Sequence, residues 1–190
     1  DDVLERSRSL GFLGPGPVGP QREHARSFVD GLGGVDRLLD LGSGGGLPGL
    51  VLAWEVPGTE IVLVDAMTKR CEFLEWAVAA LGLGSRVAVR CGRAEELARE
   101  AELRGAFPLV VARSFGTPAV LAECAVGFLD GPDARILVSE PPDADDSAQR
   151  WPAEGLAQLG LRRGGLTHRH GGTIKELVVE SAVSDRFPRR

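Results

Sequence analysis

The sequence predicts an α/β domain built on a mostly parallel, doubly wound sheet with helices on both faces. From residue 35 onward, short β-branched or Leu-rich runs alternate with helix-length amphipathic runs, the pattern of a parallel sheet. The chain has 190 residues, 43% hydrophobic and 26% charged, which suits one domain of ordinary size. The longest apolar runs are strand-length and fall far short of the roughly 20 residues that a membrane span needs, so no membrane partner is expected.

Five strands are expected before residue 141, and the helices between them carry recognisable start signals. Pro48 at a first helical position, Thr68 and Thr117 each mark the beginning of a helix. In the second helix, over Lys69–Leu81, apolar residues recur at helical spacing and form one buried stripe. The expected strands are Arg37–Leu41, Glu60–Asp65, Arg86–Cys91, Leu109–Arg113 and Ala134–Ser139.

The pattern changes after Trp151. One more helix is expected to about Leu159, followed by two consecutive strands over Leu161–His168 and Ile174–Val183. The connection between these strands is too short for a crossover, so they must pair antiparallel. The sequence therefore predicts a sheet whose last strand runs against the others.

The amino-terminal residues differ in composition from the rest. We expect residues 1–34 to form a separate segment and residues 35–190 to form the main domain. Gly11–Pro20 holds four glycines and three prolines, too many breakers for a helix or strand, and predicts a loop. A short polar helix is expected over Gln21–Leu32, ended by the two following glycines.

Charge and cysteine content exclude several classes of protein. The net charge of −5 gives no support for broad, nonspecific binding of nucleic acid. Cys71, Cys91 and Cys124 form no C-x-x-C pair, and each lies in an apolar run that is typical of a reduced core cysteine. The first residues show no secretory signal pattern. We therefore expect a cytoplasmic protein without a structural metal.

The glycine-rich stretch after the first strand is the main candidate for ligand binding, because ligands of open α/β sheets sit beyond the carboxyl ends of the strands. Gly44, Gly46 and Gly49 match the dinucleotide pattern G-x-G-x-x-G, a weak signal in a chain with 26 glycines. The pattern hydrophobic-Asp-hydrophobic-Gly-x-Gly-x-Gly is more specific, because it also uses Asp40. An acidic residue there suits a cationic ligand amine better than a pyrophosphate. A plain turn between strand and helix is the third interpretation.

Two further strand ends carry candidate residues. Asp65 ends the second strand, where a carboxylate can accept both hydroxyls of an adenosine ribose, although it also fits as an ordinary surface turn residue. Nicotinamide dinucleotides and S-adenosylmethionine both bring that ribose, so Asp65 alone does not separate them. After the third strand, Ala94 and Glu95 would lie near an adenine edge, although Glu95 also fits as an ordinary first-turn helix residue. The antiparallel last strand favours the methyltransferase sheet over a dinucleotide-binding one.

Four segments carry a more specific pattern: Asp40–Gly49, Leu63–Leu74, Gly92–Glu96 and Ala112–Phe115. Together they resemble the RsmG (GidB) family of bacterial enzymes, which transfer a methyl group from S-adenosylmethionine to N7 of a guanine in 16S rRNA. The similarity runs from about residue 35 to residue 140. It implies a class I S-adenosylmethionine-dependent methyltransferase fold, this cofactor, and the small ribosomal subunit as partner. The cofactor-binding residues that the resemblance implies are Asp40, Gly42, Ser43, Gly44, Gly46, Leu47, Asp65, Ala66, Ala94, Glu95 and Arg113.

Arg113 is the candidate catalytic residue on the substrate side. Its guanidinium, at the end of the fourth strand, can hold a phosphate or the O6 edge of a guanine, or else pair with a nearby carboxylate. Phe115 either stacks on the target base or packs against the next helix. Lys69 and Arg70 are either solvated or partnered by an anion. Guanine N7 carries a free lone pair, so the reaction needs alignment more than a base.

Three departures from the family lie on the substrate side. The Gly11–Pro20 segment replaces a helical region, Glu140 stands where the family usually has lysine, and Lys175-Glu176 replaces an Arg-His pair. A carboxylate beside an RNA site would repel phosphate. Two rival interpretations follow: a divergent member that methylates another substrate such as a small molecule, or a noncatalytic S-adenosylmethionine-binding module. Basic residues over Arg162–Lys175 either share one edge of the sheet, where they could meet RNA phosphates and would favour rRNA, or are ordinary exposed turn residues.

Overall fold

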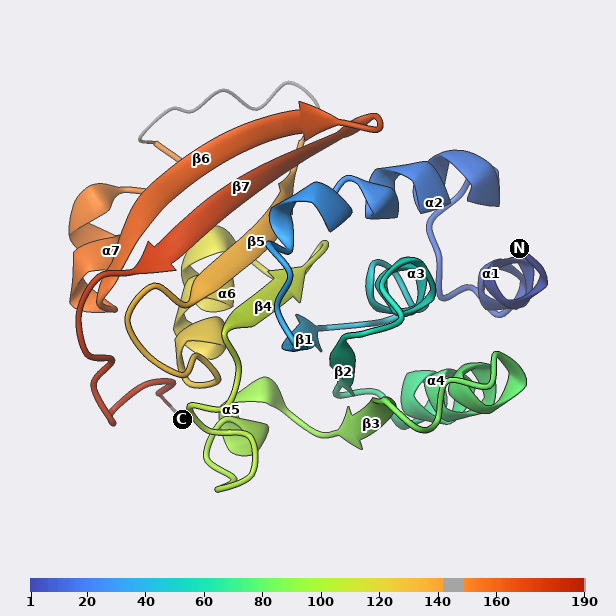
Figure 1. The fold of residues 1–190 in the computed structure, drawn as a ribbon, viewed down its shortest axis with the longest axis horizontal. Coiled ribbons are helices and arrows are strands. Elements are labelled where there is room, and N and C mark those ends of the chain that lie inside the picture. Colours follow the sequence, from blue (N-terminus) through green and yellow to red (C-terminus); the bar gives the residue numbers. More distant parts are fainter. Residues whose placement is uncertain (142–148, 190) are drawn as a thin grey trace.

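A seven-stranded sheet forms the centre of the computed structural model, which describes residues 1–141 and 149–189 (Figure 1). The strand order is β3-β2-β1-β4-β5-β7-β6. Neighbours from β3 to β5 pair in parallel, whereas β7 runs antiparallel to both β5 and β6. The predicted sheet with a reversed last strand is therefore confirmed. The strands are β1 Arg37–Leu41, β2 Glu60–Asp65, β3 Val87–Cys91, β4 Leu109–Ala112, β5 Arg135–Glu140, β6 Leu161–Arg169 and β7 Gly172–Val179.

Helices cover both faces of the sheet, with α2, α3 and α4 on one side and α5, α6 and α7 on the other (Figure 1). Among the described residues, no helix has the length and apolar character needed to cross a bilayer. The helices are α1 Asp2–Ser9, α2 Val18–Arg26, the 3-10 helix η1 Val29–Gly31, α3 Gly49–Glu55, α4 Thr68–Ala80, α5 Ala94–Leu97, α6 Pro118–Val126 and α7 Ala153–Gln158.

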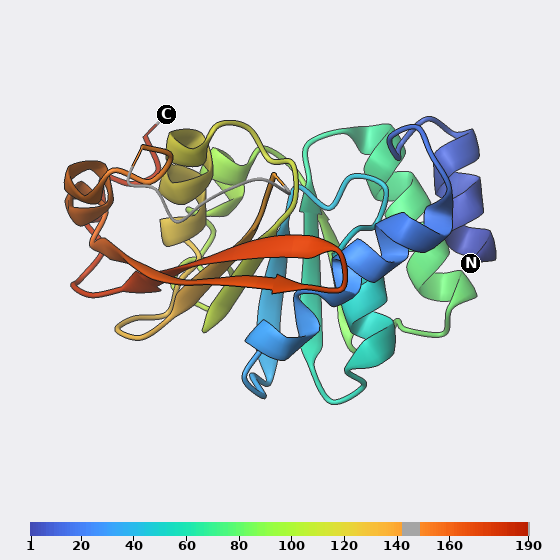
Figure 2. The ribbon, with the colours of Figure 1, turned by 90° about the horizontal axis from the view of Figure 1, so that it is seen from above.

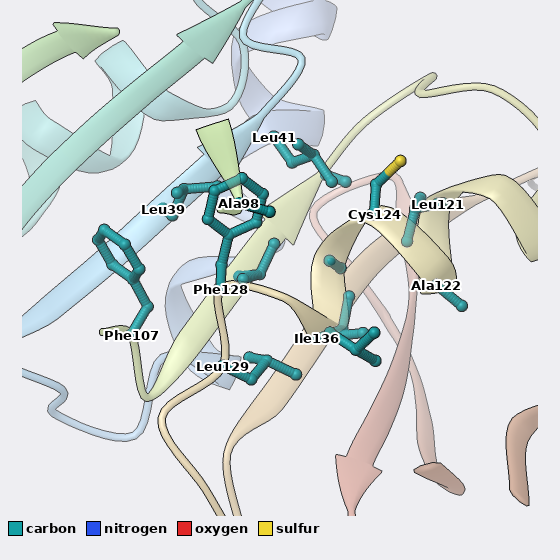
Figure 3. Packing of buried hydrophobic residues seen from close by; sticks show 14 of the residues in the cluster. Leu39, Leu41, Ala98, Phe107, Leu121, Ala122, Cys124, Phe128, Leu129 and Ile136 are labelled. Carbon is teal, nitrogen blue, oxygen red and sulfur yellow. The ribbon is translucent and has the colours of Figure 1, made fainter. Parts of the chain in front are cut away.

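The core consists of one apolar cluster on each face of the sheet and a third, smaller cluster made by residues of α1, α2 and α3 and the loop before α3. On the side of α5, α6 and α7, Phe107 and Phe128 meet edge to face with their ring centroids 6.4 Å apart (Figure 3). On the opposite side, Leu38 and Leu74 belong to the second cluster. β1 contributes to both clusters because its residues alternate between the two faces. Each large apolar side chain that is fully buried contributes about 1.5–3 kcal/mol, so the two clusters fix the sheet and its strand ends.

The amino-terminal segment departs from the predicted boundaries. α2 begins at Val18, earlier than expected, and ends at Arg26, short of Leu32. Pro20 is tolerated because it lies in the first turn, where a missing N–H breaks no helical hydrogen bond. Helix starts elsewhere are closer to expectation: the Thr117 hydroxyl accepts a hydrogen bond from the N–H of Val120, at 3.5 Å, and caps α6 as predicted.

The prediction of three reduced core cysteines is wrong for two of them. Cys71 in the first turns of α4 and Cys91 at the end of β3 form a disulfide, with 5.8 Å between their Cα atoms. That separation is typical of a disulfide. Because the two residues are 20 positions apart, only the packing of α4 beside β3 brings them together. Cys124 is a free, buried cysteine as expected.

Candidate functional site

The loop after β1 forms a glycine turn at the carboxyl edge of the sheet. The N–H groups of Gly42 and Ser43 donate to the carbonyl of Val64 in β2, at 2.9 and 2.8 Å. A Cβ added at Gly44 would make ordinary van der Waals contacts, 3.7 Å from the carbonyl oxygen of Gly42 and 3.9 Å from a guanidinium nitrogen of Arg70, and Gly44 lines a cavity. The space beside Gly46, by contrast, is filled by Leu50 of α3. The turn thus presents Gly44 to the cavity and uses Gly46 for packing.

Asp40 lies beneath this turn with 0% of its surface exposed. Its Oδ2 accepts a hydrogen bond from the N–H of Gly49 at 3.0 Å, while Oδ1 has no hydrogen-bond partner among the described residues. Burial raises the pKa of Asp40 to about 7, and the hydrogen bonds and the positive charge of Arg113 oppose that shift only in part. The structure therefore places Asp40 beneath the glycine turn, with one carboxylate oxygen that has no hydrogen-bond partner among the described residues.

Asp65 faces the glycine turn from the end of β2 and is 5% exposed. Its Oδ2 accepts from the N–H of Gly44 and its Oδ1 accepts from the N–H of Met67, each at 2.9 Å. The guanidinium of Arg70 lies 3.7 Å from Oδ2. Since each carboxylate oxygen has two lone pairs, both oxygens keep one acceptor position after these contacts. Arg70 thus has a partner anion, which was one of the two predicted alternatives.

A cavity of about 170 Å³ lies against the turn and brings Arg70 and Arg113 together with Gly44. One guanidinium nitrogen of Arg113 donates to the main-chain carbonyl of Gln21 at 3.3 Å. Burial lowers the pKa of Arg113, and the negative charge of Asp40 opposes this effect. No carboxylate of the described residues lies within 4.0 Å of the Arg113 guanidinium, so the predicted alternative of a direct ion pair is not observed.

Residues of the amino-terminal segment form the outer wall of this cavity, which sequence reasoning missed. Phe12, Leu13 and Gln21 line it. The hydroxyl of Ser7 donates a buried hydrogen bond of 2.8 Å to the carbonyl of Gly45. The aromatic rings of Phe12 and Phe73 of α4 pack together with their centroids 5.7 Å apart. The only signal in the sequence is an apolar pair, Phe12-Leu13, within a segment otherwise made of glycine, proline and valine.

Other predicted site residues lie away from the cavity. Ala94 is buried in the core, and the Glu95 carboxylate pairs with Arg93 at 3.1 Å beside a separate hollow along α5. Ala66 follows Asp65 and is exposed. Phe115 packs over Gly42 and against the core, which supports the packing interpretation over base stacking. By contrast, the predicted residues Gly42, Ser43 and Leu47 do line the cavity.

The basic residues of the β6–β7 hairpin are divided between the two faces of the sheet. Register places Arg163 and His168 on the face that carries α7, and Arg162 and Arg169 on the opposite face. Arg169 is paired with Asp30 at 2.9 Å. Lys175 is only 2% exposed, which contradicts its expected place in a basic rim. The predicted single basic edge is therefore wrong for Lys175 and is split for the arginines.

Comparison with known proteins identifies the family. A model of the GidB family, described as rRNA small subunit methyltransferase G, matches residues 27–138, more than half of the chain. The chain belongs to the GidB family. Its relatives include ribosomal RNA small subunit methyltransferase G of Prochlorococcus marinus (strain MIT 9313), 43% identical over 60% of this chain and 47% of the relative. The same enzyme of Synechococcus sp. (strain WH7803) is 30% identical over 80% of this chain and 62% of the relative.

The GidB-family chain thus spans about half the length of the curated relatives it matches. Solved structures show its fold. An O-methyltransferase from Bacillus cereus in complex with SAH gives a TM-score of 0.67 at 18% identity, covering 94% of this chain and 91% of that one. A riboflavin-derivative dimethyltransferase, RosA from Streptomyces davawensis, gives 0.68 at 19% identity, with coverages of 85% and 55%. The predicted class I methyltransferase fold is confirmed.

Proposed function

We propose that this GidB-family chain is an S-adenosylmethionine-dependent methyltransferase that acts on N7 of a guanine in the 16S rRNA of the small ribosomal subunit. The observation that carries the proposal is the juxtaposition of Asp65, the cavity-lining Gly44 and Arg113 at three neighbouring strand ends. Relatives that align with 60% and 80% of this chain are named as rRNA methyltransferases. Since ribosomal subunits are cytoplasmic, this substrate would place the protein in the cytoplasm.

The residues around the glycine turn fit a cofactor with a ribose and a cationic amine. Asp65 keeps acceptor positions for ribose hydroxyls, and Oδ1 of Asp40 is a buried acceptor without a partner among the described residues. The cavity of about 170 Å³ is smaller than the roughly 300–1,000 Å³ of most small-molecule sites. Part of such a cofactor would therefore lie outside it, toward Asp65 at the end of β2 and Glu95 in α5, the helix that follows β3.

The proposed reaction needs positioning rather than proton transfer. S-adenosylmethionine supplies a methyl group on a sulfonium, and the lone pair of guanine N7 is available at neutral pH, so the chain's residues have to align and desolvate the two. Arg113 is proposed to hold the O6 edge of the guanine or an adjacent phosphate, because its five donors suit planar oxygen acceptors. Donation to O6 leaves N7 free to react.

Cofactor binding tests the first half of the proposal. Isothermal titration calorimetry with S-adenosylmethionine should show binding that Asp65→Ala weakens by about 5- to 150-fold, because a charged hydrogen-bonding partner worth about 1–3 kcal/mol is removed. Asp36→Ala is the matched control, since Asp36 is an exposed carboxylate before β1, at the opposite edge of the sheet. Binding of NADH in place of S-adenosylmethionine would refute the proposal.

Methyl transfer tests the second half. Labelled S-adenosylmethionine is incubated with the protein and small ribosomal subunits, naked rRNA or a metabolite extract. We expect label in the 16S rRNA, at N7 of a guanine. Label only in the metabolite extract would support a divergent family member, and cofactor binding without any transfer would support a noncatalytic module. Either result would refute the rRNA assignment.

A further inference from the structure

Helix α2 lies beside the carboxyl ends of β4 and β5 and next to the tip of the β6–β7 hairpin (Figures 1 and 2). Nε2 of His24, on this helix, makes a hydrogen bond with the hydroxyl of Ser139 in β5 at 2.7 Å. A Cβ added at Gly172, at the start of β7, would lie only 3.0 Å from Cδ2 of the His24 ring. The imidazole of His24 thus projects from α2 onto β5 and β7, at the edge of the sheet where the proposed substrate would enter.

The same helix also holds Arg113. The carbonyl of Gln21 accepts the hydrogen bond from Arg113, and Gln21 lies three residues before His24, so both contacts arise from adjacent turns on one side of α2. Gln21 and Arg113 line the cavity beside the glycine turn, whereas His24 lies behind them against β5. Any movement of α2 away from β5 would therefore move the carbonyl that orients the guanidinium.

An uncharged imidazole at His24 is compatible with the nearby positive charge of Arg113. Partial burial lowers its pKa, and the nearby positive charge of Arg113 lowers it further. At neutral pH the imidazole is accordingly uncharged, which avoids a second cation against Arg113. The groups that face it are the Arg113 guanidinium from the end of β4, the Ser139 hydroxyl from β5 and the backbone of Gly172 from β7.

We propose that His24 is a positioning residue for the substrate: by tying α2 to Ser139, it keeps the Gln21 carbonyl on Arg113 and so fixes the guanidinium that meets the RNA. This inference rests on the proposed function and adds to it. It assigns no contact between His24 and the cofactor. The cofactor residues Asp40, Asp65 and Gly44 belong to other strand ends and do not touch the imidazole.

The test compares His24→Ala, His24→Gln and Ser139→Ala in the full chain, with Glu23→Gln as a control on the same helix. For methyl transfer to small ribosomal subunits, His24→Ala should raise KM about tenfold, roughly the effect of one lost hydrogen bond. Ser139→Ala should do the same. His24→Gln, whose amide can still reach the serine hydroxyl, should recover to within about threefold of wild type. The calorimetric Kd for S-adenosylmethionine and the KM of Glu23→Gln should stay within about twofold.

Two results would overturn the inference alone: a His24→Ala variant with wild-type KM, or one whose KM rise is accompanied by an equal loss of cofactor affinity. Retention of small ribosomal subunits on filters gives a second readout without catalysis, and it should weaken by the same factor in His24→Ala. A wild-type chain that binds cofactor but neither methylates nor retains ribosomal subunits would refute the proposed function itself. The two failures are therefore distinguishable.

Discussion

The buried carboxyl of Asp40 makes the stability of this fold dependent on pH, and Asp40→Asn should remove that dependence. Asp40 is fully buried, and only one of its oxygens accepts a hydrogen bond among the described residues. Its pKa is about 7 in the folded protein, against an ordinary value of 3.8. The folded state therefore holds a proton on Asp40 over a pH range in which the unfolded chain has released it.

The direction and size of the pH effect on stability follow from the difference between the pKa of Asp40 in the folded and in the unfolded protein. Because the folded pKa is raised, the stabilising contribution is complete below about pH 4 and is lost as the pH rises through about 7. Each pH unit in that window costs about 1.4 kcal/mol, so the total loss approaches about 4 kcal/mol. Asparagine does not titrate and keeps an oxygen for the N–H of Gly49. Relative to wild type, Asp40→Asn should gain up to about 4 kcal/mol between pH 4 and pH 8.

Urea unfolding at intervals between pH 4 and pH 8 measures this difference for wild type and variant. The informative quantity is the slope of the stability difference with pH, because the amide adds a constant offset of its own. Glu60→Gln at the exposed start of β2 is the control, and its stability difference from wild type should stay flat over the window. A stability difference for Asp40→Asn that does not change between pH 4 and pH 8 would refute the raised pKa of the buried Asp40 carboxyl.

Two further predictions concern the segments around the site. Gly45→Ala should destabilise the fold by about 1–3 kcal/mol, because an added Cβ would collide with the side chains of Ser7 and Leu13 and would lie 2.8 Å from the main-chain oxygen of Phe12. Thermal unfolding measures this loss. Gly58→Ala is the control, because a Cβ added at Gly58 would have no atom within 4 Å. Reduction of the Cys71–Cys91 disulfide should lower the free energy of unfolding by about 3 kcal/mol, as expected for a loop of about 20 residues. Urea unfolding with and without dithiothreitol measures the loss, and the double variant Cys71→Ala/Cys91→Ala should show no response to the reductant.

Features set by local sequence were predictable, and features set by contacts between distant segments were not. β1 and β2 match the expected bounds because each is a compact apolar run that ends in a polar turn. Asp65 is where the sequence predicted it, since the carboxyl ends of parallel strands share one edge. By contrast, the contact of Ser7 with Gly45 and the bond of His24 to Ser139 join residues 38 and 115 positions apart. No periodicity or motif encodes contacts between such distant segments, so the amino-terminal residues that line the cavity, Phe12, Leu13, Gly14 and Gln21, were missed.

Two of the departures from the family pattern, Glu140 and Lys175, are buried in the interior of the domain, whereas residues of the third, the Gly11–Pro20 segment, line the cavity. Glu140 is 4% exposed; its Oε1 accepts from Nε1 of Trp151 at 2.6 Å, and Arg150 pairs with it. Lys175 pairs opposite Val138, so it lies on the same face of the sheet as Glu140. A buried carboxylate that is paired with a cation repels an approaching phosphate far less than an exposed one. The sequence-based objection to an RNA substrate assumed an exposed Glu140, and its burial removes the physical basis of that objection.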